Sequence, residues 1–465
     1  MIENDAFKLL LINLFHLNPD DIANILCTTF NKMMVLLVTL TDKHQACPYC
    51  GFTAPKIKEY VTKEITHSAL TTQKCIIKYR ARRYKCPCCG KTYYEFNPFV
   101  FKSQKISILT VHNILKDLKD FNETFTSVAR RYHVSPTSVS TIFDNHVDIG
   151  RNPLPEIINF DEVYAFKSEK SKYVCVLLDF KKQIPVDVLP NRKKEYLLNY
   201  FQKIPLEERK KVKYACSDMY EVYRDVVHKV FPAAKHLLDY FHLSQDFHRK
   251  MNEVRIKVMK GYKDNKASDE YYLLKKFNWL LFKNPEDEDK YGRLFDVERE
   301  RKYNSHFKSY MNYYDLRKKL LEINNDLTIC YSLKLELVDF YSKSTIDNAQ
   351  VNLEHLIRSC IDTNIEEMIA FSNNLINWKQ EIINSFTIVG TEYKVEADKG
   401  QVVVCNKKVN NAIIENRNKI IKCIKNNANG YTNWPRFRNR VMYVLDPNAT
   451  FSLEPREKQS WMHKT

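Results

Sequence analysis

The chain has 465 residues, 44% of them hydrophobic and 12% aromatic, a composition that excludes a disordered chain and a length that allows two to four domains. Its formal net charge of +17 is clustered, with about twelve Lys and Arg against three acids in residues 56–105 and about nine against Glu415 alone in 407–440. Such clusters indicate a polyanionic partner, nucleic acid first and an anionic membrane surface second.

Segments for export or membrane insertion are not expected. The longest apolar run, residues 33–38, is far shorter than the ~20 residues of a membrane span, and the first residues lack a basic region and a cleavage site. The thirteen cysteines are therefore expected to be cytosolic thiols. Their odd number, with four in paired CxxC spacing, favours metal binding over a disulfide framework. These features predict a cytoplasmic protein.

The N-terminal region contains two cysteine knuckles, preceded by a predicted helix at residues 6–15 and a predicted strand at 33–40. Four thiolates are the number that a tetrahedral structural Zn²⁺ takes, and Gly51 and Gly90 ease the tight turn of each knuckle. A shifted pair that uses Cys88, or reduced cysteines without a metal, are the alternatives. The expected ligands of one structural Zn²⁺ are Cys47, Cys50, Cys86 and Cys89.

Strands are expected between the knuckles, because residues 74–85 alternate in character. Basic side chains lead directly into the second knuckle, and a basic ribbon beside a zinc ribbon suits contacts with phosphates. The side chains expected to bind DNA here are Arg80, Arg82 and Arg83.

Residues 125–143 fit a helix-turn-helix, with a plain helical hairpin as the alternative. Small Ala129 falls where the two helices meet, and Ser135 followed by Pro136 predicts the start of the second helix. His133 stands where the turn often has Gly. The expected core positions are Val128, Tyr132, Val134, Val139 and Ile142. The expected DNA-facing side chains are Thr137, Ser138 and Thr141.

A boundary at Gly150 and Pro155 is followed by three predicted strands, a helix, a strand, a helix and a strand, within residues 157–239. This order predicts an α/β layer with one hairpin edge and crossover helices. Its first strand carries Asp161, a carboxylate that is costly to bury unless it is paired, hydrogen-bonded or bound to a metal.

The following residues, about 242–388, show long 3.6-residue periodicity, which predicts an all-helical insertion. A hairpin is expected next, turning at residues 398–400. A helix then presents an apolar face of isoleucines opposite a polar face, and Gly430 is expected to cap it. The polar face contains Asn411, Glu415, Asn418 and Lys422. A last, basic helix offers further candidates for DNA contact: Arg436, Arg438 and Arg440.

Three carboxylates could converge on one edge of the predicted sheet: Asp161, Asp218 and Glu415. In a basic chain they match the needs of two Mg²⁺ ions that activate water or a hydroxyl and stabilise the leaving oxygen of a phosphodiester displacement. The spacing does not exclude other acids as members of this set of metal ligands, namely Asp179, Asp239 and Glu162.

The order of these motifs resembles the ISL3 family of bacterial insertion-sequence transposases from Cys47 to about Leu445. The likeness rests on the knuckles and helix-turn-helix, on FDEVYAF, SDMYEVY, DYFHL and LKLELVDFY, and on the segment around Glu415. It implies an RNase H-like fold and a DDE triad of Asp161, Asp218 and Glu415. It also implies accessory roles for Asp239 and His242. The chain departs from the family pattern around the glutamate, with Asn410, Asn411, Ala412 and Asn416, and in the added hairpin at 391–405.

The resemblance implies that two Mg²⁺ (or Mn²⁺) ions per site support nicking of a transposon end and attack of the freed 3′-hydroxyl on target DNA. The zinc ribbon and helix-turn-helix would read terminal inverted repeats in double-stranded DNA. Pairing of two ends implies a homodimer or larger assembly in the bacterial cytoplasm, associated with the nucleoid. The alternatives are a catalytically silent DNA-binding regulator and an RNase H-like nuclease that cuts without joining.

The expected fold is thus a mixed α/β core with a helical insertion, preceded by two DNA-binding modules. The expected domains are a zinc-ribbon region (1–105), a helix-turn-helix (106–150), the catalytic core in two parts (151–241 and 391–447), the insertion (242–390) and a tail (448–465).

Overall fold

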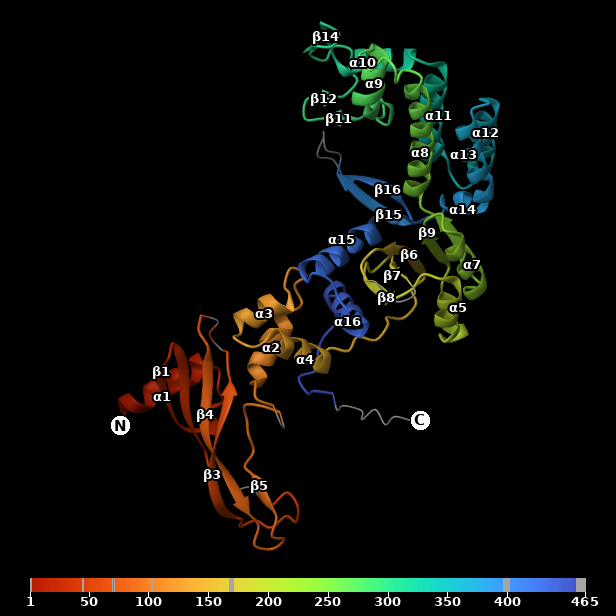
Figure 1. Cartoon of the computed structure of the whole chain (residues 1–465). Helices are drawn as coiled ribbons and strands as arrows, with labels where there is room; N and C mark the ends of the chain where they lie inside the picture. Colours follow the sequence, from red (N-terminus) through yellow and green to blue (C-terminus); the bar gives the residue numbers. More distant parts are fainter. Residues whose placement is uncertain are drawn as a thin grey trace.

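The computed structural model describes residues 2–43, 46–68, 70, 72–101, 104–166, 171–395 and 402–456. Figure 1 shows an elongated molecule, with a sheet of N-terminal residues at one end, a mostly helical region at the other and a second sheet between them. Within the described ranges, no helix is both long and apolar enough to cross a bilayer. The chain is a mixed α/β protein, as the sequence predicts.

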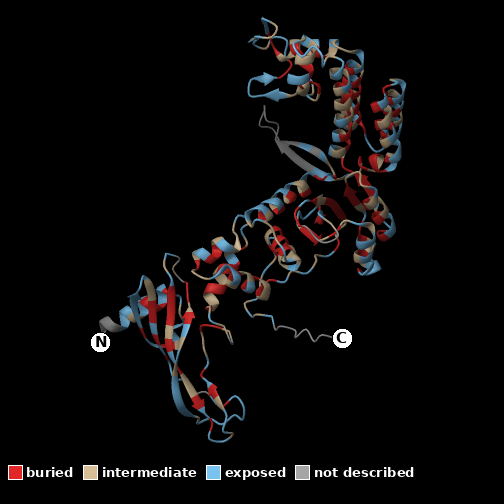
Figure 2. Cartoon of the chain, viewed as in Figure 1, coloured by how far each residue is buried: buried red, intermediate tan, exposed pale blue. Residues whose placement is uncertain are grey.

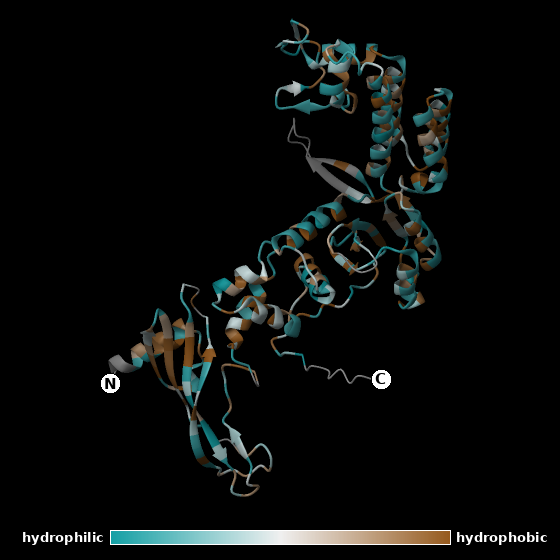
Figure 3. Cartoon of the chain, in the orientation of Figure 1, coloured by the Kyte–Doolittle hydropathy of each residue, from teal (hydrophilic) through white to brown (hydrophobic). Residues whose placement is uncertain are grey.

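The N-terminal sheet packs against one helix. Its elements are α1 (Ile2–Leu14), the 3₁₀ helix η1 (Pro19–Asp21), β1 (Ile22–Phe30), β2 (Met33–Leu40), β3 (Lys56–Thr66), β4 (Cys75–Lys85) and β5 (Thr92–Tyr94). The strand order is β1-β2-β4-β3, with β5 on β4. Phe15, Leu36 and Ile77 are fully buried between helix and sheet. The β3–β4 pair continues beyond this core as a ribbon whose far end is mostly hydrophilic (Figure 3).

Three short helices follow, and the second and third of them fall in the segment that the sequence predicts to be helical. They are α2 (Ile108–Asp117), α3 (Phe125–Arg131) and α4 (Pro136–His146). Ser135 caps α4 by accepting the N–H of Ser138, and Pro136 occupies the first turn. Ala129 is buried where α3 meets α4. His133 has a φ of 54°, a left-handed conformation that explains why Gly is common at this position of such turns.

The central sheet has the strand order β10-β9-β6-β7-β8. Its strands are β6 (Ile157–Val163), β7 (Val174–Asp179), β8 (Pro185–Leu189), β9 (Tyr214–Ser217) and β10 (Lys235–Leu238). The hairpin strands β6, β7 and β8 are antiparallel, whereas β6, β9 and β10 are parallel. The predicted order of three strands, helix, strand, helix and strand is therefore confirmed. The strands are almost entirely buried (Figure 2).

Helices cover both faces of the central sheet. They are α5 (Lys194–Gln202), α6 (Leu206–Arg209), α7 (Glu221–Val230), α15 (Ala412–Asn427) and α16 (Trp434–Leu445). Phe160 of β6 packs with Phe201 and Tyr223 of α5 and α7. Val163, on the opposite face of the same strand, packs with Ile414 of α15. Because side chains alternate along a strand, Asn159 and Asp161 share the face of Val163 and point toward α15.

The region between the two parts of the core is mostly helical. Its helices are α8 (Tyr240–Lys260), α9 (Asp269–Lys276), the 3₁₀ helix η2 (Asn278–Leu281), α10 (Tyr313–Glu322), α11 (Asn325–Lys343), α12 (Ala349–Asp362), α13 (Glu366–Asn377) and α14 (Lys379–Asn384). They share one large apolar core that includes Phe247, Leu320 and Phe371.

The prediction of an all-helical insertion is wrong in one stretch, which forms two small hairpins. These are β11 (Glu288–Asp289) with β12 (Gly292–Arg293), and β13 (Lys302–Asn304) with β14 (Ser309–Met311). Gly292 has a φ of 98°, which permits the first turn, and the stretch after Pro285 is too polar to supply an apolar helical face. The rings of Tyr303 and Tyr310 pack across the second hairpin.

The predicted hairpin after the helical region is present as β15 (Ile388–Val395) and β16 (Val402–Lys408). Its predicted turn at residues 398–400 lies outside the described residues. The chain then enters α15, which returns to the central sheet beside β6 (Figure 1).

Candidate active site

Three aspartates meet where the parallel strands of the central sheet end. Asn159 of β6 pairs with Cys216 of β9, and Ser217 of β9 pairs with Leu238 of β10. Extending these registers puts three carboxylates level on neighbouring strands, at Asp161, Asp218 and Asp239. Asp161 lies within β6, two residues before its end. Parallel pairing therefore builds an acidic rim from residues that are far apart in sequence.

A buried asparagine network fixes the start of α15 on this rim. The side-chain amide of Asn159 donates to Asn411 Oδ1 at 2.7 Å and to the carbonyl of Asn410 at 2.8 Å. The backbone N–H of Asn411 donates to Asp239 Oδ1 at 3.2 Å. Asn411 is fully buried. The network ties the first turn of α15 to two strands, and Glu415 follows one turn later.

Glu415 lies beside the accessory residues that the family resemblance implied. Asp239, His242 and Glu415 each offer a ligand atom within 4.8 Å of the others. His242 Nε2 is 3.9 Å from Asp239 Oδ2, beyond a direct hydrogen bond. This spacing suits a shared cation.

Asp161 belongs to the same electrostatic cluster. Burial, and then repulsion from Asp218, Glu415 and Asp239, raise the pKa of Asp161 to about 7, although His242 opposes the shift. Burial also raises the pKa values of Asp218 and Asp239. Desolvated like charges disfavour ionisation until a cation compensates them.

The cluster also holds polar atoms without a protein partner. Among the described residues, Asp218 Oδ1, Asp239 Oδ2 and His242 Nε2 are buried and accept or donate no hydrogen bond. Leaving such atoms unpaired is costly, and carboxylate oxygens are the preferred ligands of Mg²⁺ and Mn²⁺. The donor set therefore fits divalent cations.

The rival acids have other partners. Asp179 Oδ1 accepts the backbone N–H groups of Lys181 and Lys182 at 2.9 and 3.0 Å, so it caps the turn after β7. Glu162 forms an ion pair with Arg192. Only Asp239 among the three rivals joins the acidic rim within the described chain.

Asn418 is a site residue that sequence reasoning did not single out. Its side-chain amide donates to Asp161 Oδ2 at 2.7 Å, and it is 5% exposed. The polar face of α15 therefore points inward at the carboxylates, although polar faces usually point to solvent. The sequence did contain a signal that could have identified Asn418, because its spacing puts it on the same helical face as Asn411 and Glu415.

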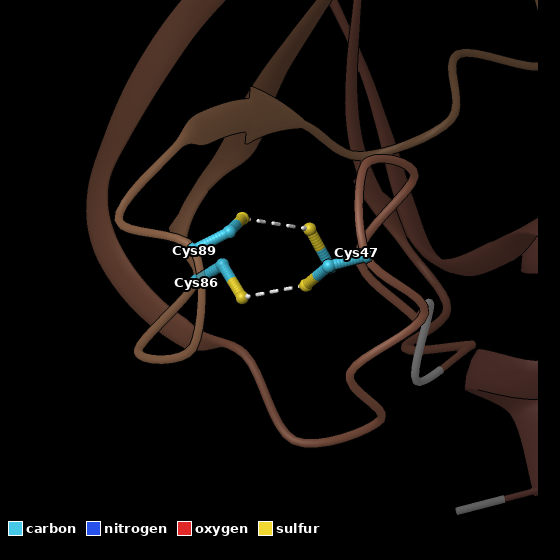
Figure 4. Close-up of side chains that lie close together, drawn as sticks. Cys47, Cys86 and Cys89 are labelled. Carbon is cyan, nitrogen blue, oxygen red and sulfur yellow. Dashed lines mark hydrogen bonds between the residues drawn. The ribbon is translucent and has the colours of Figure 1, made fainter.

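The four predicted cysteine ligands also come together, at the far end of the β3–β4 ribbon (Figure 4). Cys47 Sγ is 3.7 Å from Cys89 Sγ, and Cys50 Sγ is 3.5 Å from Cys86 Sγ. The two knuckles are alike: the residue after each second cysteine is Gly with positive φ, whose N–H donates to the carbonyl of the first cysteine at 2.9 Å. Four sulfurs within 4.8 Å of one another fit a tetrahedral metal site.

The three arginines of the ribbon differ in their surroundings. Arg80 is exposed and lies over the ring of Tyr60. Arg82 forms an ion pair with the buried Glu95 at 2.7 Å and donates to a backbone carbonyl of β2, so it joins elements of the sheet. Arg83 pairs with a glutamate of β3 at 2.7 Å. Arg80 is thus the most accessible of the three.

The arginines of α16 mostly connect parts of the protein. Arg436 pairs with an aspartate of α4, and Arg438 pairs with a buried aspartate of β8. Arg440 is 1% exposed and donates to the carbonyls of Asp120 and Glu123 at 2.8 Å each. Contrary to the sequence prediction, Arg440 has no exposed surface for a phosphate. On α4, by contrast, Thr137 and Thr141 are exposed and Ser138 is half-buried.

Comparison with known proteins identifies the family. A family model for transposases of the DDE class and ISL3 group matches residues 158–397. The chain belongs to the ISL3 family of insertion-sequence transposases. It is also 20% identical to the transposase for insertion sequence element IS1001 of Bordetella parapertussis over 411 residues, which cover 88% of this chain and 91% of that relative. The matched range of the family model includes Asp161, Asp218, Asp239 and His242, whereas Glu415 lies after it. ISL3 membership implies a nuclease or transferase activity on DNA and the use of divalent metal ions.

Proposed function

We propose that this ISL3 transposase binds terminal inverted repeats and catalyses metal-dependent cleavage and strand transfer of its insertion sequence. One observation carries the proposal: Asp161, Asp218 and Glu415 lie in one partly buried cluster of charges with Asp239 and His242. The strand order of the central sheet, with three antiparallel strands followed by two parallel ones, supports an RNase H-like core.

In this proposal Asp161, Asp218 and Glu415 hold two Mg²⁺ or Mn²⁺ ions, and Asp239 and His242 assist. Bound ions supply positive charge that activates water or a 3′-hydroxyl and stabilises the leaving oxygen. The chain's own contribution is to fix the ligands.

Two asparagines of α15, Asn411 at its start and Asn418 two turns later, hold these ligands in place. Asn418 holds Asp161 Oδ2, and the backbone N–H of Glu162 donates to Asp161 Oδ1 at 2.7 Å, so this carboxylate cannot rotate freely. Asn411 holds Asp239 while it anchors the helix of Glu415. Such partners around ligands typically change metal affinity or activity by 10- to 100-fold.

DNA recognition is proposed for the two N-terminal modules. The four cysteines would hold one structural Zn²⁺ in a zinc ribbon, with exposed Arg80 on its strands. Helices α3 and α4 would act as a helix-turn-helix that presents Thr137 and Thr141 to the major groove. The division into domains expected from the sequence is proposed as well, although its boundaries at 241/242 and 390/391 fall inside α8 and β15. We further propose that the protein acts on double-stranded DNA at the bacterial nucleoid in the cytoplasm, and that it works as a homodimer or larger assembly because two transposon ends must be paired.

Cleavage and joining test the proposal directly. Purified zinc-loaded protein is incubated with Mg²⁺, a labelled transposon end and a plasmid. The parent is expected to cut and join the end, whereas Asp161→Asn and Glu415→Gln bind the end but do neither. Asp179→Asn is the matched control, because Asn can still accept the two backbone N–H groups of its turn.

The same assay separates the alternatives. Cutting without joining identifies a nuclease, and end binding without any cutting by the parent identifies a silent regulator. The unpartnered carboxylate oxygens of the rim favour catalysis, because a decayed site has no need to keep buried carboxylates together.

A further inference from the structure

A second cluster of metal-binding side chains lies behind the acidic rim, where α7, β10 and α14 meet. His228 of α7 and His236 of β10 both approach Glu381 of α14. His228 Nε2 and His236 Nδ1 are each 3.9 Å from Glu381 Oε1. All three ligand atoms lie within 4.8 Å of one another. The cluster joins the catalytic sheet to the helical region.

His236 provides independent evidence that this cluster has a ligand. The side chain is 1% exposed, and its Nε2 lies 2.9 Å from Ser217 Oγ. Within the described part of the chain, His236 Nδ1 is buried and has no hydrogen-bond partner. At 3.9 Å, Glu381 is too far for a direct hydrogen bond. The unsatisfied nitrogen is therefore directed at a carboxylate that it does not quite reach.

The arrangement has the features of a histidine that binds a metal. Such a histidine normally uses its other ring nitrogen to make a hydrogen bond that fixes the ring, which is the role that Ser217 can fill here. Glu381 is 5% exposed, so its carboxylate is largely removed from water. The nearby cation, Arg224, donates to the carbonyl of Asn377 at 2.9 Å and stacks on Trp378.

We propose that His228, His236 and Glu381 bind a Zn²⁺ ion, with water as the fourth ligand. Two imidazoles and one carboxylate favour Zn²⁺ over Mg²⁺, which prefers oxygen ligands. Bonds of about 2.0–2.1 Å in a tetrahedron place ligand atoms roughly 3.3 Å apart. Each histidine nitrogen is 3.9 Å from Glu381 Oε1, and the three ligand atoms lie within 4.8 Å of one another. Closing these separations requires an approach of about 1 Å, which the His228 side chain can supply because it is 56% exposed.

The ion would clamp the two strands behind the acidic rim. β10 runs directly from His236 into Asp239, and Ser217 precedes Asp218 on β9. The side chain of Asn384 already donates to the carbonyl of His236 at 2.9 Å, so α14 is docked on β10. A bound Zn²⁺ adds a strong link between these elements, and we assign it a structural role.

Metal content of the full-length protein tests the site. The protein is stripped of metal, reloaded with Zn²⁺ or Co²⁺ in excess Mg²⁺, and freed of unbound metal. Two equivalents are expected per chain, one at the four cysteines and one here. Co²⁺ separates them, because thiolates give intense charge-transfer absorption and the His-Glu site gives only weak ligand-field bands.

His228→Gln and Glu381→Gln are expected to lose one equivalent and the weak bands while they keep the thiolate absorption. His355→Gln is the matched control, because this exposed histidine also pairs with a glutamate, at 2.8 Å, but belongs to no three-residue metal-binding cluster among the described residues. His228 is exposed, so its replacement leaves the core intact. Glu415→Gln is expected to keep both equivalents.

Three results would overturn the inference. They are a parent that binds one equivalent only, His228→Gln and Glu381→Gln proteins that retain both, and loss of the second equivalent in Glu415→Gln. The last result would assign the second Zn²⁺ to the cluster of Asp239, His242 and Glu415. Each result leaves the proposed transposase activity untouched, because that activity is measured separately with Mg²⁺.

Discussion

Replacing Asp161 by Asn is expected to stabilise the magnesium-free protein at alkaline pH while it abolishes catalysis. Burial and neighbouring carboxylates raise the pKa of Asp161 from 3.8 to about 7 in the folded protein. The folded state therefore binds this proton more tightly than the unfolded state. As a result, the stability of the parent falls while pH rises from about 4 to about 7, and stays reduced above that.

The size of this effect follows from the shift. Each pKa unit corresponds to about 1.4 kcal/mol, so a shift of about three units is worth about 4 kcal/mol in total. Between roughly pH 5 and pH 8, Asp161 contributes about 3 kcal/mol of that loss. Asn is neutral at every pH, so the Asp161→Asn protein should not show this loss of folding stability between pH 5 and pH 8.

The assay is urea unfolding of zinc-loaded, magnesium-free parent and variant at both pH values. Asp187→Asn is the control, because it removes a buried carboxylate that pairs with Arg438 at 2.7 Å and should destabilise the protein at both pH values. Added Mg²⁺ should stabilise the parent at pH 8 more than it stabilises Asp161→Asn. Equal pH dependence in parent and Asp161→Asn would refute the reasoning.

Further predictions concern the supporting residues. Cys86→Ser should lose the cysteine-bound Zn²⁺, and Cys88→Ser should keep it, as measured by metal content. The reverse result would show that Cys88, and not Cys86, is the zinc ligand. Asn418→Ala should lower strand transfer about 10- to 100-fold with little change in folding, and unchanged transfer would remove it from the site. Arg440→Ala should lose about 3 kcal/mol of stability in urea unfolding, because two buried carbonyls lose their donor. Arg80→Ala should instead bind DNA more weakly, with a salt slope reduced by about one, and unchanged stability.

Local chemistry made much of this architecture predictable. The knuckle spacing, the Ser135–Pro136 helix start and the alternating or periodic apolar patterns each depend on residues close in sequence. The hairpin edge and the crossover helices of the central sheet were predictable because short connections allow few arrangements, whereas the order in which its five strands lie side by side was not predicted. The two small hairpins were missed, since they depend on Gly292 and on local polarity within a region of strong helical periodicity.

The details of the acidic rim required long-range information. The hydrogen bonds of Asn159 with Asn411 and of Asn418 with Asp161 join residues more than 250 positions apart. Asn411 and Asn418 look like solvent-facing residues in a helical pattern, and only packing against β6 shows that they are buried. Arg440 was misassigned for a similar reason, because a basic helix does not reveal which of its arginines faces the interior.

Binding of Mn²⁺ to the zinc-loaded protein, followed by electron paramagnetic resonance, tests most directly whether the acidic rim is a two-metal site. The parent and Asp179→Asn are expected to bind Mn²⁺ with the same stoichiometry and affinity. Asp161→Asn, Asp218→Asn and Glu415→Gln should each weaken that binding at least tenfold. Mn²⁺ binding that is the same in all five proteins would contradict the assignment of these carboxylates.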